Sequence, residues 1–281
     1  MKHSNTQQGF SLVELMITLA LGLIISGALI QIMVGNNITE RLNQAVASVQ
    51  ESGRFIISRL RNDLLMTGRY DILAPALNRN GVDVAVEAAF VQNHPVPLPG
   101  DFINDASVGA IEGTSGANDT LVVSFQGVTD CSGVNQGYGA NEEFFVVNQY
   151  FVSGTSLQCR GFDGRNLVGT NLAYTLLDDV YSFQVQYGVT NTFASQDNSS
   201  VPVSFVTADR LAALRAGGSQ VVAIRIAVLI RADSDVNIDP VPSFKLLDET
   251  AIQPSQKRLF KQFETTITLR NVKNFIRSRN I

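Results

Sequence analysis

The stretch Gly9-Phe10-Ser11-Leu12-Val13-Glu14-Leu15-Met16-Ile17 decides the fold of this chain. It follows a short polar leader, residues 1–9, and opens an apolar run in which Glu14 is the one charged residue between Gly9 and Thr39. An ordinary secretory signal places its apolar run before the cleavage point, whereas here the polar leader comes first. Residues 10–33 are long enough to cross a hydrocarbon core of roughly 30 Å, which takes about 20 helical residues. The chain is therefore predicted to begin as a membrane anchor.

This order of leader, junction and apolar run resembles the class III leader of type IV pilins and type II pseudopilins. In that family a prepilin peptidase cuts after the glycine, methylates the new amino terminus and leaves the apolar segment in the mature protein. The resemblance places the cut between Gly9 and Phe10, makes Phe10 the N-methylated terminus and makes Glu14 the family's buried assembly glutamate. Residues 1–9 would then be removed.

Glu14 is costly inside an apolar segment, because insertion scales assign roughly 2–3 kcal/mol to an acidic or basic residue there. Ionisable groups within membranes therefore usually have a partner and a function. The free amino group created at Phe10 is the candidate partner, in the same chain or, as the resemblance implies, in the adjacent subunit of a filament. The alternative is a single-pass anchor in which Glu14 stays hydrated near the lipid headgroups.

The apolar pattern continues beyond the membrane segment as an amphipathic stripe. Its members recur at steps of three and four residues, as on one face of a helix: Leu42, Val46, Val49, Gly53, Ile56 and Leu60. Unbroken over residues 10–67, this helix would be about 87 Å long. Its first part, about 10–33, would be transmembrane, and Gly68 supplies a stop signal.

Residues 68–281 mostly carry strand signals separated by Gly, Asn, Asp and Pro. Strands are expected at 82–91, 120–126, 143–152, 156–160, 180–189, 220–232 and 263–269, and a short helix at 208–216 with Thr207 as its N-cap. Residues 220–232 are nearly all apolar, which indicates a central strand covered on both faces. The expected class is α+β: a long N-terminal helix packed on a large antiparallel β-sheet domain, with one or two sheets left open. This is also the pilin fold.

Cysteine and charge add two further expectations. Because the anchor leaves the rest of the chain outside the cytoplasm, Cys131 and Cys159 indicate one disulfide, with two free buried thiols as the alternative. The net charge of -4 conceals a basic C-terminal end, made up of Lys257, Arg258, Lys261, Arg270, Lys273, Arg277 and Arg279. Such an end suits anionic lipid, nucleic acid or an acidic partner, or is simply a solvated tail and strand edge.

Several later stretches resemble PilW-type minor pilins. They are residues 50–55, 60–68, 127–131, 144–152, 157–159, 180–188, 221–231 and 268–271. The resemblance implies a low-abundance pilin that joins other minor pilins at the inner membrane, primes assembly of the type IV pilus and sits at its tip with a PilY-type adhesin. Its partners would be these pilins, the major pilin and the prepilin peptidase. Twitching motility and cell adhesion would depend on it.

The sequence offers little for catalysis. His94 is the one histidine left after leader removal, and no nucleophile elbow, phosphate loop or dinucleotide fingerprint is present. No enzyme activity and no cofactor are expected. A weak calcium candidate alternates Asp233, Asp235, Asn237 and Asp239, as in the first half of a calcium loop. Ile238 and Phe244 stand where such a loop has its glycine and its bidentate glutamate, so a solvated loop is the favoured interpretation.

Two other functions remain open from the sequence. The J-type minor pseudopilin of type II secretion shares the leader, the glutamate and a β-rich domain, although greater length and the Cys131 and Cys159 stretch favour PilW. A DNA-binding or surface-binding pilin would use the basic C-terminus, and its binding would depend on salt.

Overall fold

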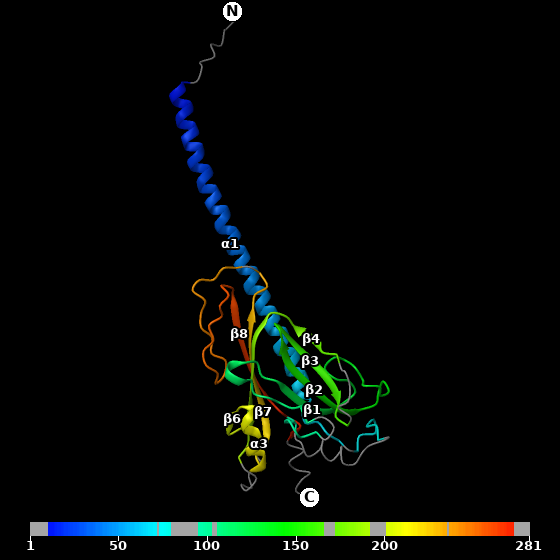
Figure 1. Ribbon diagram of the computed structural model, residues 1–281. Helices are drawn as coiled ribbons and strands as arrows, with labels where there is room; N and C mark the ends of the chain where they lie inside the picture. Colours follow the sequence, from blue (N-terminus) through cyan, green and yellow to red (C-terminus); the bar gives the residue numbers. More distant parts are fainter. Residues whose placement is uncertain are drawn as a thin grey trace, which may run out of the picture.

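The computed structural model describes residues 11–71, 73–79, 95–102, 106–165, 172–191, 201–234 and 236–272. Its dominant element is the helix α1 (Leu12–Leu65), 54 residues long. The first half of α1 projects away from the domain, and the second half lies against the sheets (Figure 1). The expected long helix is confirmed, and it ends two residues before position 67, just ahead of Gly68 with its φ of +76°.

The amphipathic stripe of α1 faces the core. Its fully buried members follow the expected steps of three and four residues: Ala45, Val49, Gly53, Ile56, Leu60 and Leu64. Leu42 and Ile57 are partly buried and pack beside them. Because that stripe is covered along its length, the second half of α1 is held by tertiary packing as well as by its own hydrogen bonds.

Within the described residues, the strands form two four-stranded sheets. One has the order β1-β2-β3-β4 and contains β1 (Leu121–Gly127), β2 (Phe144–Ser153), β3 (Ser156–Asp163) and β4 (Tyr174–Leu177). The other has the order β6-β5-β7-β8 and contains β5 (Val180–Val189), β6 (Ser204–Val206), β7 (Val221–Arg231) and β8 (Phe260–Thr268). All neighbouring strands are antiparallel. Between β6 and β7 lies the short helix α3 (Ala208–Ala216), and a 3-10 turn η1 (Thr114–Gly116) precedes β1.

The strand β7 is central and covered on both faces, as its composition predicts. Ile224 and Ile226 join the core shared with α1, whereas Ala227 and Leu229 pack against residues of the following loop, among them Leu246. The same large core takes in side chains of the first sheet, such as Tyr150. The two sheets and the second half of α1 therefore share one apolar interior.

Gly53 allows α1 to approach the edge strand β8. A Cβ atom at this position would overlap the ring of Phe263, which packs directly against the helix backbone. Glycine costs a helix up to about 1 kcal/mol relative to alanine, so this close approach explains its presence in the buried stripe.

We expect Gly53→Ala to destabilise the domain by about 1–3 kcal/mol, although alanine is the better helix former, because the Phe263 ring must move. The measurement is thermal unfolding of the full chain in detergent, followed by far-UV circular dichroism. Gly35→Ala is the matched control in the same helix, since a Cβ there meets nothing within 4 Å. Equal melting temperatures for the two variants would contradict this account of Gly53.

Most expected strands are present with shifted ends. Two were missed, β4 and β6, which are short edge strands of four and three residues. The helix expected at 208–216 is confirmed as α3, although Thr207 at its N-cap makes no capping bond and instead bonds to Asp209. The strand expected at 82–91 lies outside the described residues.

Candidate assembly surface

The first half of α1 exposes nearly all of its large apolar side chains. Between Leu12 and Ile38 these side chains are 52–77% exposed. The helix is long and apolar enough to cross a membrane, and the most apolar 18-residue window has a mean hydropathy of 2.3 with none of it buried within the chain. An exposed apolar surface of this extent needs a cover of lipid or of neighbouring helices.

Glu14 lies in the first turn of α1 and is exposed. Three residues before it, Ser11 stands at the N-cap, so the pair has the spacing of a capping box, yet the Ser11 side chain makes no capping bond. A carboxylate in the first turn is favoured by the helix dipole, typically by about 0.3–1 kcal/mol. No ion pair joins Glu14 to another described residue. Gly9 and Phe10 lie outside the described residues, so cleavage, N-methylation and the assembly contact stay predictions.

Cys131 and Cys159 form a disulfide. Their Cα atoms are 6.3 Å apart, and the bond ties the loop after β1 to the strand β3. Both residues are buried. The loop is held further by the backbone N–H of Cys131, which donates to the Asn148 Oδ1 atom at 3.0 Å.

A polar link joins the end of α1 to this disulfide loop. Arg59 donates to the backbone carbonyl of Cys131 at 2.8 Å and pairs with Asp63 at 3.3 Å. The hydroxyl of the fully buried Tyr150 donates to Asp63 at 3.0 Å. Burial raises the pKa of Asp63, and Arg59 and Tyr150 oppose that rise. Burial and the Asp63 charge raise the pKa of Tyr150 well above its usual value, so Tyr150 stays a neutral donor. The helix is thereby fixed to the first sheet as well as to the second.

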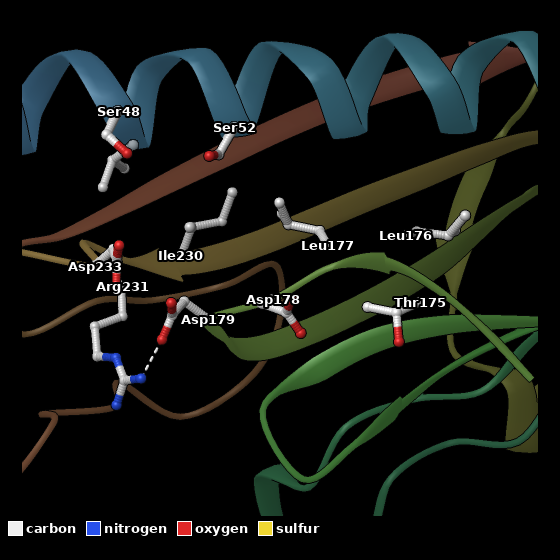
Figure 2. A pocket seen from close by; sticks show the side chains of 11 residues that line it. Ser48, Ser52, Thr175, Leu176, Leu177, Asp178, Asp179, Ile230, Arg231 and Asp233 are labelled. Atoms are coloured by element: carbon white, nitrogen blue, oxygen red, sulfur yellow. Dashed lines mark hydrogen bonds and ion pairs between the residues drawn. The ribbon is translucent and has the colours of Figure 1, made fainter.

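A cleft of about 490 Å³ opens beside α1 where the chain passes from β4 to β5 (Figure 2). Ser48 and Ser52 reach it from the helix, and Asp179 pairs with Arg231 in its wall. The lining combines hydroxyls and carboxylates with a few apolar side chains and carries no arrangement typical of catalysis.

The calcium candidate is not assembled among the described residues. Asp233 lines the cleft, whereas Asp239 pairs with Lys257 at 2.7 Å, which already offsets its charge. Asp235 lies outside the described residues, and Asn237 is exposed. Within the described part of the chain, no three acidic, histidine or cysteine side chains are grouped as a metal site would require.

The basic C-terminal end is only partly within the described residues. Lys257 is the partner of Asp239, and Lys261 lies over the Phe263 ring at 5.8 Å. Lys273, Arg277 and Arg279 lie outside the described residues, as does His94. The basic surface that the alternative DNA-binding role would use is therefore not seen as a continuous patch over the described residues.

A cluster of carboxylates beside α3 was missed by sequence analysis. Its two most buried members are Glu112 and Asp119, which the fold brings together with Asp209 and Asp248. These residues are spread over more than a hundred positions and share no motif, so no local sequence pattern could have predicted the cluster.

Comparison with known proteins identifies two families in the sequence. Residues 4–30 match the prokaryotic N-terminal methylation motif, and residues 143–271 match the family described as Type IV Pilus-assembly protein W, or PilW. Among solved structures, a type IV-like pilin from Thermus thermophilus is similar, with 16% identity and a TM-score of 0.36 over 58% of this chain and 82% of that chain. A search of curated proteins gave no match. The family assignment rests on the two sequence matches and not on the structural likeness.

These matches agree with the geometry of the molecule. The methylation motif covers the junction at Gly9 and the start of α1, and the PilW match covers both sheets from β2 to β8. The leader motif and the exposed apolar helix fit a pilin anchored in the inner membrane, processed by a prepilin peptidase and in contact with other pilus components. The PilW match also favours the pilus over the J-type pseudopilin. The methylation motif and the PilW domain together identify this chain as a PilW-type minor pilin of the type IV pilus.

Proposed function

We propose that this minor pilin takes part in a tip complex that primes assembly of the type IV pilus, and that it thereby supports twitching motility and adhesion. The observation that carries the proposal is the form of α1: an exposed apolar half with one carboxylate in its first turn, joined without a break to a half that is packed into a folded domain. Such a helix both resides in lipid and offers a surface on which like helices can pack.

The proposed mechanism is mechanical. Prepilin peptidase removes residues 1–9, Phe10 becomes the methylated terminus, and residues 10–33 hold the chain in the inner membrane with residues 68–281 in the periplasm. In the complex, Glu14 meets the amino terminus of a neighbouring pilin, so the cost of its charge in an apolar setting is offset. The assembled helices then lower the barrier to extracting the next pilin from lipid, and a PilY-type adhesin joins the same complex at the tip.

The rigidity of the domain supports this role. Contacts with β8, the shared core and the Arg59, Asp63 and Tyr150 link fix α1 to both sheets, so a force on the helix is transmitted to the whole domain. A loosely tethered domain would not place its surface reproducibly beside neighbouring subunits.

Deleting the gene in a strain without a redundant minor-pilin set should abolish or sharply reduce surface pili, because the priming step is lost. Electron microscopy and counts of sheared pili measure the result, and the gene supplied on a plasmid is the control. Co-purification of the full chain from detergent-solubilised membranes should recover other minor pilins. Normal piliation in the deletion strain would overturn the proposal, and loss of exoprotein secretion with intact pili would point to the J-type role.

A further inference from the structure

Phe55 is an aromatic side chain on α1 that the domain leaves uncovered. It follows the exposed Arg54 and precedes the fully buried Ile56, and 56% of its surface is exposed. Its ring stacks on no other aromatic ring of the described residues. A single exposed apolar side chain is common on protein surfaces, so the surroundings of Phe55 decide whether it marks a contact.

Two clefts open on the side of α1 that faces the first sheet, one on each side of Phe55 along the helix. The first, of about 490 Å³, lies between α1 and the end of β4 (Figure 2). The second, of about 370 Å³, lies between the last turns of α1 and the loop after β1. Helix residues that line these clefts recur, with Phe55, at steps of three and four along one face: Ser48, Ser52, Phe55, Arg59, Asn62 and Met66. This side of α1 is therefore hollowed over about 27 Å, with Phe55 near its middle.

The charges within these clefts are paired inside the chain. Arg59 and Asp63 form an ion pair at 3.3 Å in the second cleft, and Arg231 pairs with Asp179 in the first. The other charged side chains nearby are exposed: Glu51, Arg54, Asp178 and Asp233. An aromatic centre with a polar, solvated rim is the usual composition of a protein contact surface. Apolar or small uncharged side chains therefore fit these clefts better than charged ones.

The same side of the helix continues into its apolar half. Steps of seven residues back from Phe55 lead to Ser48, Arg41, Val34 and Gly27, and positions seven apart face one partner when two helices wind around each other. Val34 is 52% exposed, and a Cβ atom at Gly27 would meet nothing within 4 Å in its own chain. Small residues let a second helix approach closely in a membrane. Gly27 therefore suits a neighbouring helix, in contrast to Gly53, which suits the Phe263 ring.

We propose that the side of α1 centred on Phe55 binds the corresponding long helix of a neighbouring pilin, with side chains of that helix entering the two clefts. The two helices run parallel, because both chains begin in the same membrane and place their domains on the same side of it. The inference rests on the proposed function for its partner, a pilin of the same complex. It adds the face of α1 that is used and makes Phe55 its anchor outside the membrane.

The first test is co-purification of full-length Phe55→Ala from detergent-solubilised membranes. We expect about tenfold less co-purified pilin than with the natural chain, the size of loss that truncating a central aromatic anchor causes. The melting temperature should stay within about 2 °C, since the side chain is mostly exposed. Phe55→Leu, which keeps an apolar contact, should retain most of the partner. Leu73→Ala is the matched control, because Leu73 is 81% exposed and lies in the turn after α1.

The second test locates the partner directly. A photoreactive phenylalanine analogue is carried at position 55 or, as the control, at position 73, and the cross-linked peptides are identified by mass spectrometry. We expect position 55 to cross-link to the periplasmic half of another pilin's long helix, and position 73 to give no such product. Cross-links from position 55 to a β-sheet domain alone, or to lipid alone, would overturn the proposal.

Failure of this inference is distinguishable from failure of the proposed function. If Phe55→Ala co-purifies its partners at the natural level while deletion of the gene still abolishes pili, this surface is not the contact and the priming role stands. If deletion leaves piliation normal, the priming role fails, whereas a cross-link from position 55 to a pilin helix still supports the contact.

Discussion

Glu14→Ala should abolish or strongly reduce incorporation of this pilin into filaments while leaving it processed and in the membrane. Removing the carboxylate takes away the group that we expect to pair with the amino terminus at Phe10 of a neighbouring subunit. Insertion should become easier, because an acidic residue in the apolar helix costs roughly 2–3 kcal/mol. The variant should therefore accumulate in the inner membrane, with its leader removed and its terminus free.

Sheared pili and membrane fractions, probed with an antibody against the β-sheet domain, measure both outcomes. Thr18→Ala is the matched control one turn further along, since the Thr18 hydroxyl bonds only to the backbone of its own helix at Leu15. We expect this control to assemble normally. Incorporation of Glu14→Ala at the natural level would show that the charge is not an assembly contact and would favour a glutamate hydrated near the headgroups.

Replacing both Cys131 and Cys159 by alanine should lower the free energy of unfolding by about 3–4 kcal/mol. The bond closes a loop of 28 residues in sequence separation, and the chain-entropy model assigns a loop of this length a contribution of that size. The loss of the disulfide should also affect the position of α1, because the Cys131 carbonyl accepts a hydrogen bond from Arg59 near the end of this helix. A loosened loop weakens the attachment of the helix to the first sheet.

Urea unfolding of the full chain in detergent, followed by circular dichroism, gives the free-energy change. The natural chain treated with a reductant before unfolding should keep its stability, since both sulfur atoms belong to buried residues, whereas reduction after unfolding should reproduce the variant. Unchanged stability of the double alanine variant would mean that the loop is held by its hydrogen bonds alone, such as that from Cys131 to Asn148.

The elements that the sequence predicts well are those with a strong local period. The stripe from Leu42 to Leu60 predicts the buried positions of α1 to within one residue. It does so because residues on one face of a helix recur at steps of three and four positions, so each buried residue is predicted by its neighbours in the pattern. The apolar run at residues 220–232 likewise predicts a strand that is buried on both faces. Short edge strands such as β4 carry no such signal, since their pairing partners lie elsewhere in the chain and part of their surface is exposed.

The division into two sheets is also a tertiary outcome. The chain passes from β4 to β5 through Asp178 and Asp179, and Asp179 takes a positive φ of 59° at this turn. The strands on either side have similar composition, so the sequence does not reveal that they belong to different sheets. The two sheets are separate because both pack against α1, whose buried stripe shares one core with side chains of each sheet.

The residues of functional interest also fall into two groups, those that the sequence predicts and those that only the tertiary structure reveals. The leader junction at Gly9 and Phe10, the carboxylate of Glu14 and the pairing of Cys131 with Cys159 could be predicted from the sequence, because each depends on a local motif or on a residue type with one partner available. The contact of Gly53 with Phe263 and the hydrogen bond from Tyr150 to Asp63 could not be predicted in this way. Both join residues that are distant in the sequence and close only after the sheets have packed. Local chemistry thus identifies this chain as a pilin with an apolar N-terminal helix, whereas burial against distant segments decides how that helix is held against the sheets.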